Sequence, residues 1–213
     1  MMINMTTLRI RQGSPIDMLQ QIKIDPATQV NRLLCLCAIL LVAGCAAPLR
    51  PEAFTNTAPA FDPVTFWTGR MASWGVVENR DGAPTAIVTT TTDATAEGPD
   101  GLHMVQHVMT AGKDTVRDWH MRRLGDGKFL ATANDMVGTA RGVASGRTFH
   151  WTWTLATKPG NGVLNVSMEQ WMYLADNGTL MNRTIITKLG VRLAEISEQF
   201  VRQNGQECDP EPR

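Results

Sequence analysis

Hydrophobic side chains follow two patterns along this chain of 213 residues. Between residues 70 and 201, apolar and polar residues alternate in short runs that are separated by turn-forming residues, as in half-buried β-strands. Residues 33–43 instead form one uninterrupted apolar run. The runs predicted as strands are 70–78, 85–96, 102–110, 115–124, 128–137 with a continuation closed at 145–146, 148–157, 163–174, 179–187 and 191–201.

The predicted strands are joined by short turns, so neighbours in sequence are expected to pair as hairpins. Roughly nine or ten strands at this spacing indicate an all-β sandwich or barrel. We expect an antiparallel up-and-down barrel of the lipocalin-like kind, because closure removes the exposed edges of a long meander. A short helix is predicted just before it over residues 61–67, where Asp62 and Pro63 suit the N-cap and the first turn.

Two of the predicted strands indicate what the interior contains. In residues 149–155 the large apolar side chains share one face. In residues 164–174 both faces carry apolar and polar side chains. Such a lining suits a ligand cavity with a few hydrogen-bonding groups, and it equally suits a filled core whose polar side chains pair with one another. The pattern leaves both interpretations open.

The apolar run has the features of a bacterial lipoprotein signal peptide. Arg32 precedes about eleven apolar residues, which are too few for the roughly 20 that a membrane-spanning helix needs. Small residues come next, and residues 41–45 (Leu-Val-Ala-Gly-Cys) closely resemble a lipobox. We therefore predict cleavage before Cys45 and acylation of that residue with fatty acids such as palmitate, which would anchor the protein to a membrane.

The residues before the signal do not look like its positively charged start, because Asp17 and Asp25 are acidic. We expect residues 1–29 to be a disordered extension or a stretch upstream of a true start at Val30. The remaining chain is predicted to divide into a signal peptide, a tether, a barrel domain and a polar tail. Their boundaries are 30–44, 45–60, 61–203 and 204–213.

Charge and cysteine content narrow the function classes. The chain has 20 basic and 20 acidic residues, of which residues 1–44 hold four and two, so the processed chain has 16 and 18. This nearly neutral balance gives no indication of the basic patch that a nucleic-acid-binding protein uses. Of the four cysteines, Cys35 and Cys37 would leave with the signal peptide and Cys45 would be acylated. Cys208 then remains alone, so no intramolecular disulfide is expected.

Several short pieces carry a family resemblance through their order and spacing. They are Phe66–Gly69, Arg117–Trp119, Asn134–Gly142, Trp151–Trp153, Trp171–Leu174, Leu180–Arg183 and Lys188–Val191. Together they resemble the bacterial lipoproteins labelled domain of unknown function 3833, over nearly the whole chain after Cys45. The resemblance implies a periplasm-facing lipoprotein with a calycin-like barrel, and it implies no established reaction.

The sequence contains no nucleophile elbow, phosphate-binding loop or zinc-protease motif. We therefore expect neither an enzyme nor a cofactor. Among the four histidines, His103 and His107 share a strand face but lie about 13 Å apart. His107 and His120 would meet across a hairpin, yet no cysteine or close carboxylate pair completes a site. No metal site is predicted.

Candidate ligand contacts come from the tryptophans and a few charged residues of the predicted strands. Asp135 is the most isolated carboxylate, and Arg183 and Lys188 lie an odd number of positions apart, so they should point to opposite faces. The inward one is expected to meet Asp135 or an anionic head group. The predicted ligand-binding residues are Trp119, Asp135, Trp151, Trp153, Trp171, Arg183 and Lys188.

These observations predict a lipid-anchored protein of the cell envelope whose barrel binds a lipid or another small apolar ligand. The alternative is a structural or partner-docking lipoprotein with a filled barrel. Ala46 and Ala47 follow the lipidated cysteine, in place of the aspartate associated with retention at the inner membrane. We therefore expect the protein at the outer membrane, facing the periplasm.

Overall fold

The computed structural model describes residues 48–157 and 164–203. Every helix and strand of the described residues belongs to one compact unit that begins at Leu49. The predicted signal peptide, Cys45, Cys208 and the turn at 158–162 lie outside the described residues. In the described part, no helix is long and apolar enough to cross a membrane.

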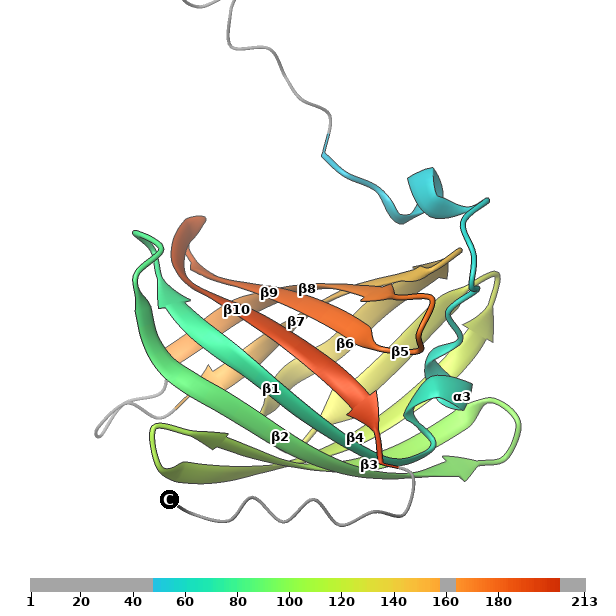
Figure 1. The fold of residues 1–213 in the computed structure, drawn as a ribbon, viewed down its shortest axis with the longest axis horizontal. Helices are drawn as coiled ribbons and strands as arrows, with labels where there is room; N and C mark the ends of the chain where they lie inside the picture. The colour runs from blue at the N-terminus through green and yellow to red at the C-terminus, as the bar shows by residue number, and fades with distance from the viewer. Residues whose placement is uncertain (1–47, 158–163, 204–213) are drawn as a thin grey trace, which may run out of the picture. The chain divides into compact units, whose positions relative to one another are not determined.

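Ten antiparallel strands form a closed barrel (Figure 1), which confirms the predicted fold. Consecutive strands pair all the way round, and the last strand closes the barrel by pairing with the first. No sheet edge is left unpaired in such a barrel. The strands are β1 (Gly69–Asn79), β2 (Pro84–Glu97), β3 (Gly101–Thr110), β4 (Lys113–Gly125), β5 (Lys128–Ala133), β6 (Met136–Ser145), β7 (Thr148–Thr157), β8 (Leu164–Leu174), β9 (Leu180–Lys188) and β10 (Val191–Arg202).

One predicted strand is in fact two. The expected run from residue 128 to its closure at 145–146 is broken at Asn134 and Asp135, which form the turn between β5 and β6. The turn is anchored to β4, because the backbone N–H of Asp118 donates to Asn134 Oδ1 at 3.0 Å. Gly138 in β6 has a positive φ of 76° and lies where the β6–β7 register shifts.

The alternation of side chains decides what fills the barrel. Along β7 the large residues Phe149, Trp151 and Trp153 are buried and face inward, as predicted. The mixed strand β8 turns Val166, Met168 and Met172 into the same core, so Gln170 faces inward with them. The core therefore includes polar side chains at positions where the strand period places them among apolar ones.

A short helix contributes to the core at one end of the barrel (Figure 1). Asp62 is the N-cap of helix α3 (Pro63–Trp67), and its side chain accepts a hydrogen bond from the Thr65 N–H at 2.9 Å. Its last residue, Trp67, is buried and meets the ring of Phe200 edge-on, with centroids 4.9 Å apart. The predicted N-cap and first turn are confirmed.

A second segment packs on the outside of the barrel. The 3₁₀-helix η1 (Pro51–Phe54) lies within the stretch predicted as a tether. Phe54 packs against the outward-facing rings of Trp171 and Tyr173, with centroids 6.2 and 5.8 Å away. Further on, the Phe61 N–H donates to the carbonyl of Gly146 at 2.7 Å. We call residues 51–61 the strap; it is docked rather than free.

Candidate functional site

The inner wall of the barrel has two chemically different halves. Aromatic side chains from β4, β5 and β7 form one half, the aromatic wall: Trp119, Phe129, Phe149, Trp151 and Trp153. The other half carries polar side chains among apolar ones; we call these polar side chains the polar arc, which runs over the adjacent strands β8, β9, β10, β1, β2 and β3. The members of the polar arc are Gln170, Asn182, Thr184, Glu198, Ser73, Thr90, Thr92 and Gln106.

A cavity of about 70 Å³ lies between the two halves. Trp119 and Trp151 border it from the aromatic wall, and Gln106, Gln170 and Glu198 border it from the polar arc. Three flexible side chains, those of Met104, Met168 and Met172, complete much of the apolar lining. A space of this size holds a few water molecules or one small chemical group.

Two glutamines join the aromatic wall to the polar arc. Gln170 Oε1 accepts hydrogen bonds from the indole N–H groups of Trp151 and Trp153, at 2.7 and 2.8 Å. Its amide nitrogen donates to Thr184 Oγ1 at 3.0 Å. Gln106 accepts from the Trp119 indole at 2.9 Å in the same manner. These bonds satisfy the indole donors that burial would otherwise leave unpaired.

Glu198 is the acidic member of the polar arc. One of its carboxyl oxygens, Oε1, accepts hydrogen bonds from Ser73 Oγ and, at 3.0 Å, from Thr90 Oγ1. Asn182 Nδ2 approaches the other oxygen at 3.4 Å. Burial raises the pKa of Glu198 above its ordinary value, although these hydrogen bonds and the charge of Arg117 act in the opposite direction.

Arg117 is the basic residue at the cavity. Its Nε donates to Asp135 Oδ2 at 2.8 Å, and its guanidinium carbon lies 4.9 Å from the centre of the Trp153 ring. Asp135 itself belongs to the β5–β6 turn, so it acts on the cavity through Arg117. The site therefore combines a cation, a carboxyl group, two amides and aromatic surface.

A model of one family matches residues 39–202, which is most of the chain. That family is described as "Protein of unknown function (DUF3833)". This chain belongs to the DUF3833 family. The resemblance expected from the sequence motifs is confirmed, and no curated protein matches the chain.

Solved structures similar to this DUF3833 protein are lipocalin-like barrels. An S-type phycobiliprotein lyase from Guillardia theta aligns with a TM-score of 0.52 and 11% identity, over 75% of this chain and 100% of the lyase chain. Rv2717c from M. tuberculosis aligns with a TM-score of 0.49 and 15% identity, over 70% and 99% of the two chains. At such low identity the first likeness supports the fold and says nothing about a ligand.

The structure brings together only part of the ligand-binding set predicted for this DUF3833 protein. Trp119 and Trp151 border the cavity, and Trp153 reaches the site through its bond to Gln170. Asp135 meets Arg117, and not the Arg183 or Lys188 that the sequence suggested. Lys188 ends β9, where its Nζ donates to the carbonyl of Asn165 at 2.5 Å.

Trp171 and Arg183 lie on the outer surface, which corrects their predicted place at the ligand. They are opposite each other on β8 and β9, and both point away from the interior. Trp171 is covered by the strap, and Arg183 makes a paired contact with Glu195 at 2.8 and 2.9 Å. A ligand inside the barrel would touch neither residue.

Polar and charged residues that border the cavity but were not among the predicted contacts include Gln106, Arg117, Gln170 and Glu198. A signal for Gln106, Gln170 and Glu198 was present in the sequence, because each is a polar residue at the inward position of a strand whose next inward neighbours are apolar. Glu198, for example, stands between the inward-facing Ile196 and Phe200. A polar residue that interrupts a run of inward-facing apolar positions is thus the useful sequence signal for a cavity residue in this protein.

Proposed function

We propose that this protein is a lipid-anchored envelope protein whose barrel binds a small amphipathic molecule, with a lipid or fatty-acid-like compound as the expected class. The observation that carries the proposal is the cavity between the aromatic wall and the polar arc. A ligand with an apolar body and one polar end has a complementary surface on both sides there.

The residues around the cavity suggest how such a ligand would lie. Its apolar part would pack on Trp119 and Trp151, and its polar end would meet Gln106, Gln170 or Glu198. Burial raises the pKa of Glu198, so its protonated form, which has an O–H group to donate to a carbonyl or carboxylate, is easier to reach than in an exposed glutamate. The polar end would therefore be an oxygen acceptor.

The cavity of about 70 Å³ is small for an acyl chain, so the lining must adapt. Met104, Met168 and Met172 provide the means, because methionine has three rotatable bonds and fills irregular spaces with little cost. Rotation of these side chains would lengthen the space along the apolar side while the polar arc keeps its hydrogen bonds.

The anchor and the location belong to the same proposal. Acylated Cys45 would hold the barrel at the periplasmic face of the outer membrane, next to a source of lipids. The lipobox at residues 41–45 supports this part of the proposal.

The test uses the intact protein isolated from cell envelopes. Native mass spectrometry should show a small molecule bound to the chain, and tryptophan fluorescence should change when fatty acids of increasing length are added. The decisive variant is Met104→Phe, which places a larger, stiffer side chain in the cavity and should weaken binding at least about tenfold. Met109→Phe is the matched control on the same strand, because Met109 is exposed on the outer surface.

A filled barrel without a ligand is the second candidate. It is favoured by the way the polar arc and the indole groups satisfy one another through Gln106 and Gln170. If no small molecule accompanies the protein and Met104→Phe behaves like Met109→Phe, the ligand proposal is wrong. The barrel would then have a structural or partner-docking role.

A further inference from the structure

The outer surface of β3 and β4 carries a group of side chains that the cavity does not use. His103 on β3 stands directly opposite His120 on β4. Asp118 precedes His120 by two positions, so the strand period places both on the same outer face. The structure corrects the expected pairing, because His107 faces Val116 and not His120.

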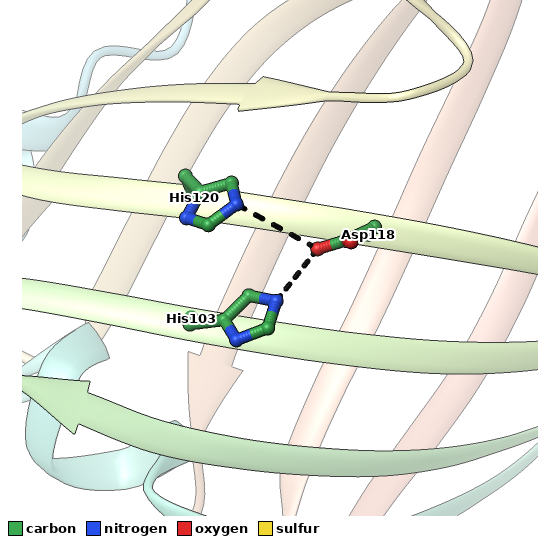
Figure 2. Close-up of side chains that lie close together, drawn as sticks. All are labelled: His103, Asp118 and His120. Carbon is green, nitrogen blue, oxygen red and sulfur yellow. Dashed lines mark hydrogen bonds and ion pairs between the residues drawn. The ribbon is translucent and has the colours of Figure 1, made fainter.

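The three side chains converge on one point, as Figure 2 shows. Asp118 Oδ1 lies 2.8 Å from His103 Nε2 and 3.8 Å from His120 Nε2. All three candidate ligand atoms lie within 4.8 Å of one another, the one such group of three found among the described residues. A tetrahedral zinc site places its ligand atoms about 3.3 Å apart, as metal–ligand distances of about 2.0–2.1 Å require.

The neighbouring residues support the group from both sides. Glu97 Oε2 lies 3.7 Å from Nδ1 of His120, the ring nitrogen that points away from the cluster. A carboxylate in that place stabilises a proton on Nδ1 and leaves Nε2 free to bind a metal. The backbone of Asp118 is held by Asn134, which accepts from its N–H and donates to its carbonyl at 3.0 and 3.3 Å.

We propose that His103, Asp118 and His120 form a binding site for a divalent transition-metal ion of the zinc type. Two imidazoles and one carboxylate suit zinc, copper or nickel, and they do not suit magnesium or calcium, which take oxygen ligands. Three protein ligands leave at least one coordination position for water or for a group from another molecule. The site is independent of the ligand proposed for the cavity.

Binding requires a modest rearrangement of the side chains. The two imidazole rings are stacked, with centroids 4.6 Å apart and planes only 6° from parallel. Parallel rings do not aim both nitrogen lone pairs at one point, so at least one ring must turn about its Cβ–Cγ bond. His120 can do so, because 56% of its side chain is exposed. An exposed site of this kind would exchange its metal with the solution.

The experiment titrates zinc into the full, untagged chain at neutral pH after treatment with a chelator, and it measures heat and thermal stability. We expect one zinc ion per chain and a rise in Tm with zinc. His103→Gln and His120→Gln should each weaken binding at least about tenfold. His107→Gln is the matched control, because His107 has its own partner, Asp114 at 3.1 Å, and should leave zinc binding unchanged.

Folding of each variant is checked by its Tm without metal. If a histidine variant fails to fold, Asp118→Asn decides the matter, since it removes the ligand charge while keeping the size of the side chain. Equal zinc binding by the wild type and these variants would assign the metal to another group, such as the Cys208 thiol, and would overturn the proposal. The absence of saturable binding would overturn it as well.

Discussion

Glu195 and Glu198 show how the side of the barrel wall sets the chemistry of a residue. They lie three positions apart on β10 and face opposite sides. The hydrogen bonds from Arg183 lower the pKa of Glu195 on the outside, whereas burial raises the pKa of Glu198 on the inside. The two carboxyl groups should therefore make opposite contributions to the pH dependence of stability.

Glu198→Gln tests the inner carboxyl group. Because the pKa of Glu198 is raised in the folded state, the folded protein keeps the carboxyl proton to a higher pH than the unfolded chain does. The free energy of unfolding of the wild type therefore falls as pH rises above about 4.5. The loss amounts to about 1.4 kcal/mol for each pH unit by which the pKa is raised. Glutamine does not titrate, so the variant should lose this slope in urea unfolding measured from pH 4 upward.

Glu195→Gln is the matched comparison on the same strand. The lowered pKa of Glu195 stabilises the fold above about pH 4.5, and this contribution disappears as pH falls through the folded value. At neutral pH the variant should lose at most about 1 kcal/mol, because half of the Arg183 side chain is exposed. If both variants change the pH slope in the same direction, the assigned environments are wrong.

At the scale of elements, the strap depends on one glycine. Gly146, in the β6–β7 turn, has a φ of 53°, and an added Cβ would overlap the carbonyl oxygen of Phe54. Gly146→Ala should therefore release the strap and destabilise the protein by about 1–3 kcal/mol through the clash. Hydrogen exchange should become faster at the amides of Phe61 and Arg147, which donate to Gly146 and Thr57.

Gly178→Ala supplies the control for backbone strain alone. Gly178 also has a positive φ, 81°, in the β8–β9 turn, but nothing lies within 4 Å of an added Cβ. Both variants carry the cost of a left-handed alanine, about 1–2 kcal/mol. Unchanged exchange at Phe61 and Arg147 in Gly146→Ala would show that the strap does not need this close approach.

Most elements could be predicted from the alternation of side chains, and the exceptions have physical reasons. The turn at Asn134 and Asp135 contains no glycine or proline that would mark it in the sequence, although the buried positions change from odd numbers in β5 to even numbers in β6. The β3–β4 register was misjudged because Ala111 and Gly112 form a two-residue turn with both φ values positive, 51° and 74°. Such a turn pairs Thr110 with Lys113 and hence His103 with His120.

The candidate site exists only at the scale of the whole barrel. The sequence placed Trp151 and Trp153 on one inward face, because their strand alternates cleanly. It did not place Glu198 near Gln106, because β10 and β3 come onto the same wall, with β1 and β2 between them, only after β10 closes against β1. A period within one strand tells which side a residue faces, and it carries no information about which distant strand lies beside it.

The proposed anchor can be separated from the barrel by one substitution. In a Gram-negative host, Cys45→Ser should move the protein from the membrane fraction to the soluble one, because the thioether and its acyl chains are lost. Cys45 precedes the described strands, so the Tm of the barrel should stay unchanged. Cys208→Ser is the control and should remain in the membrane fraction with the mass of a lipidated chain. A wild-type chain that carries no lipid would contradict the anchor while leaving the barrel and its cavity as described.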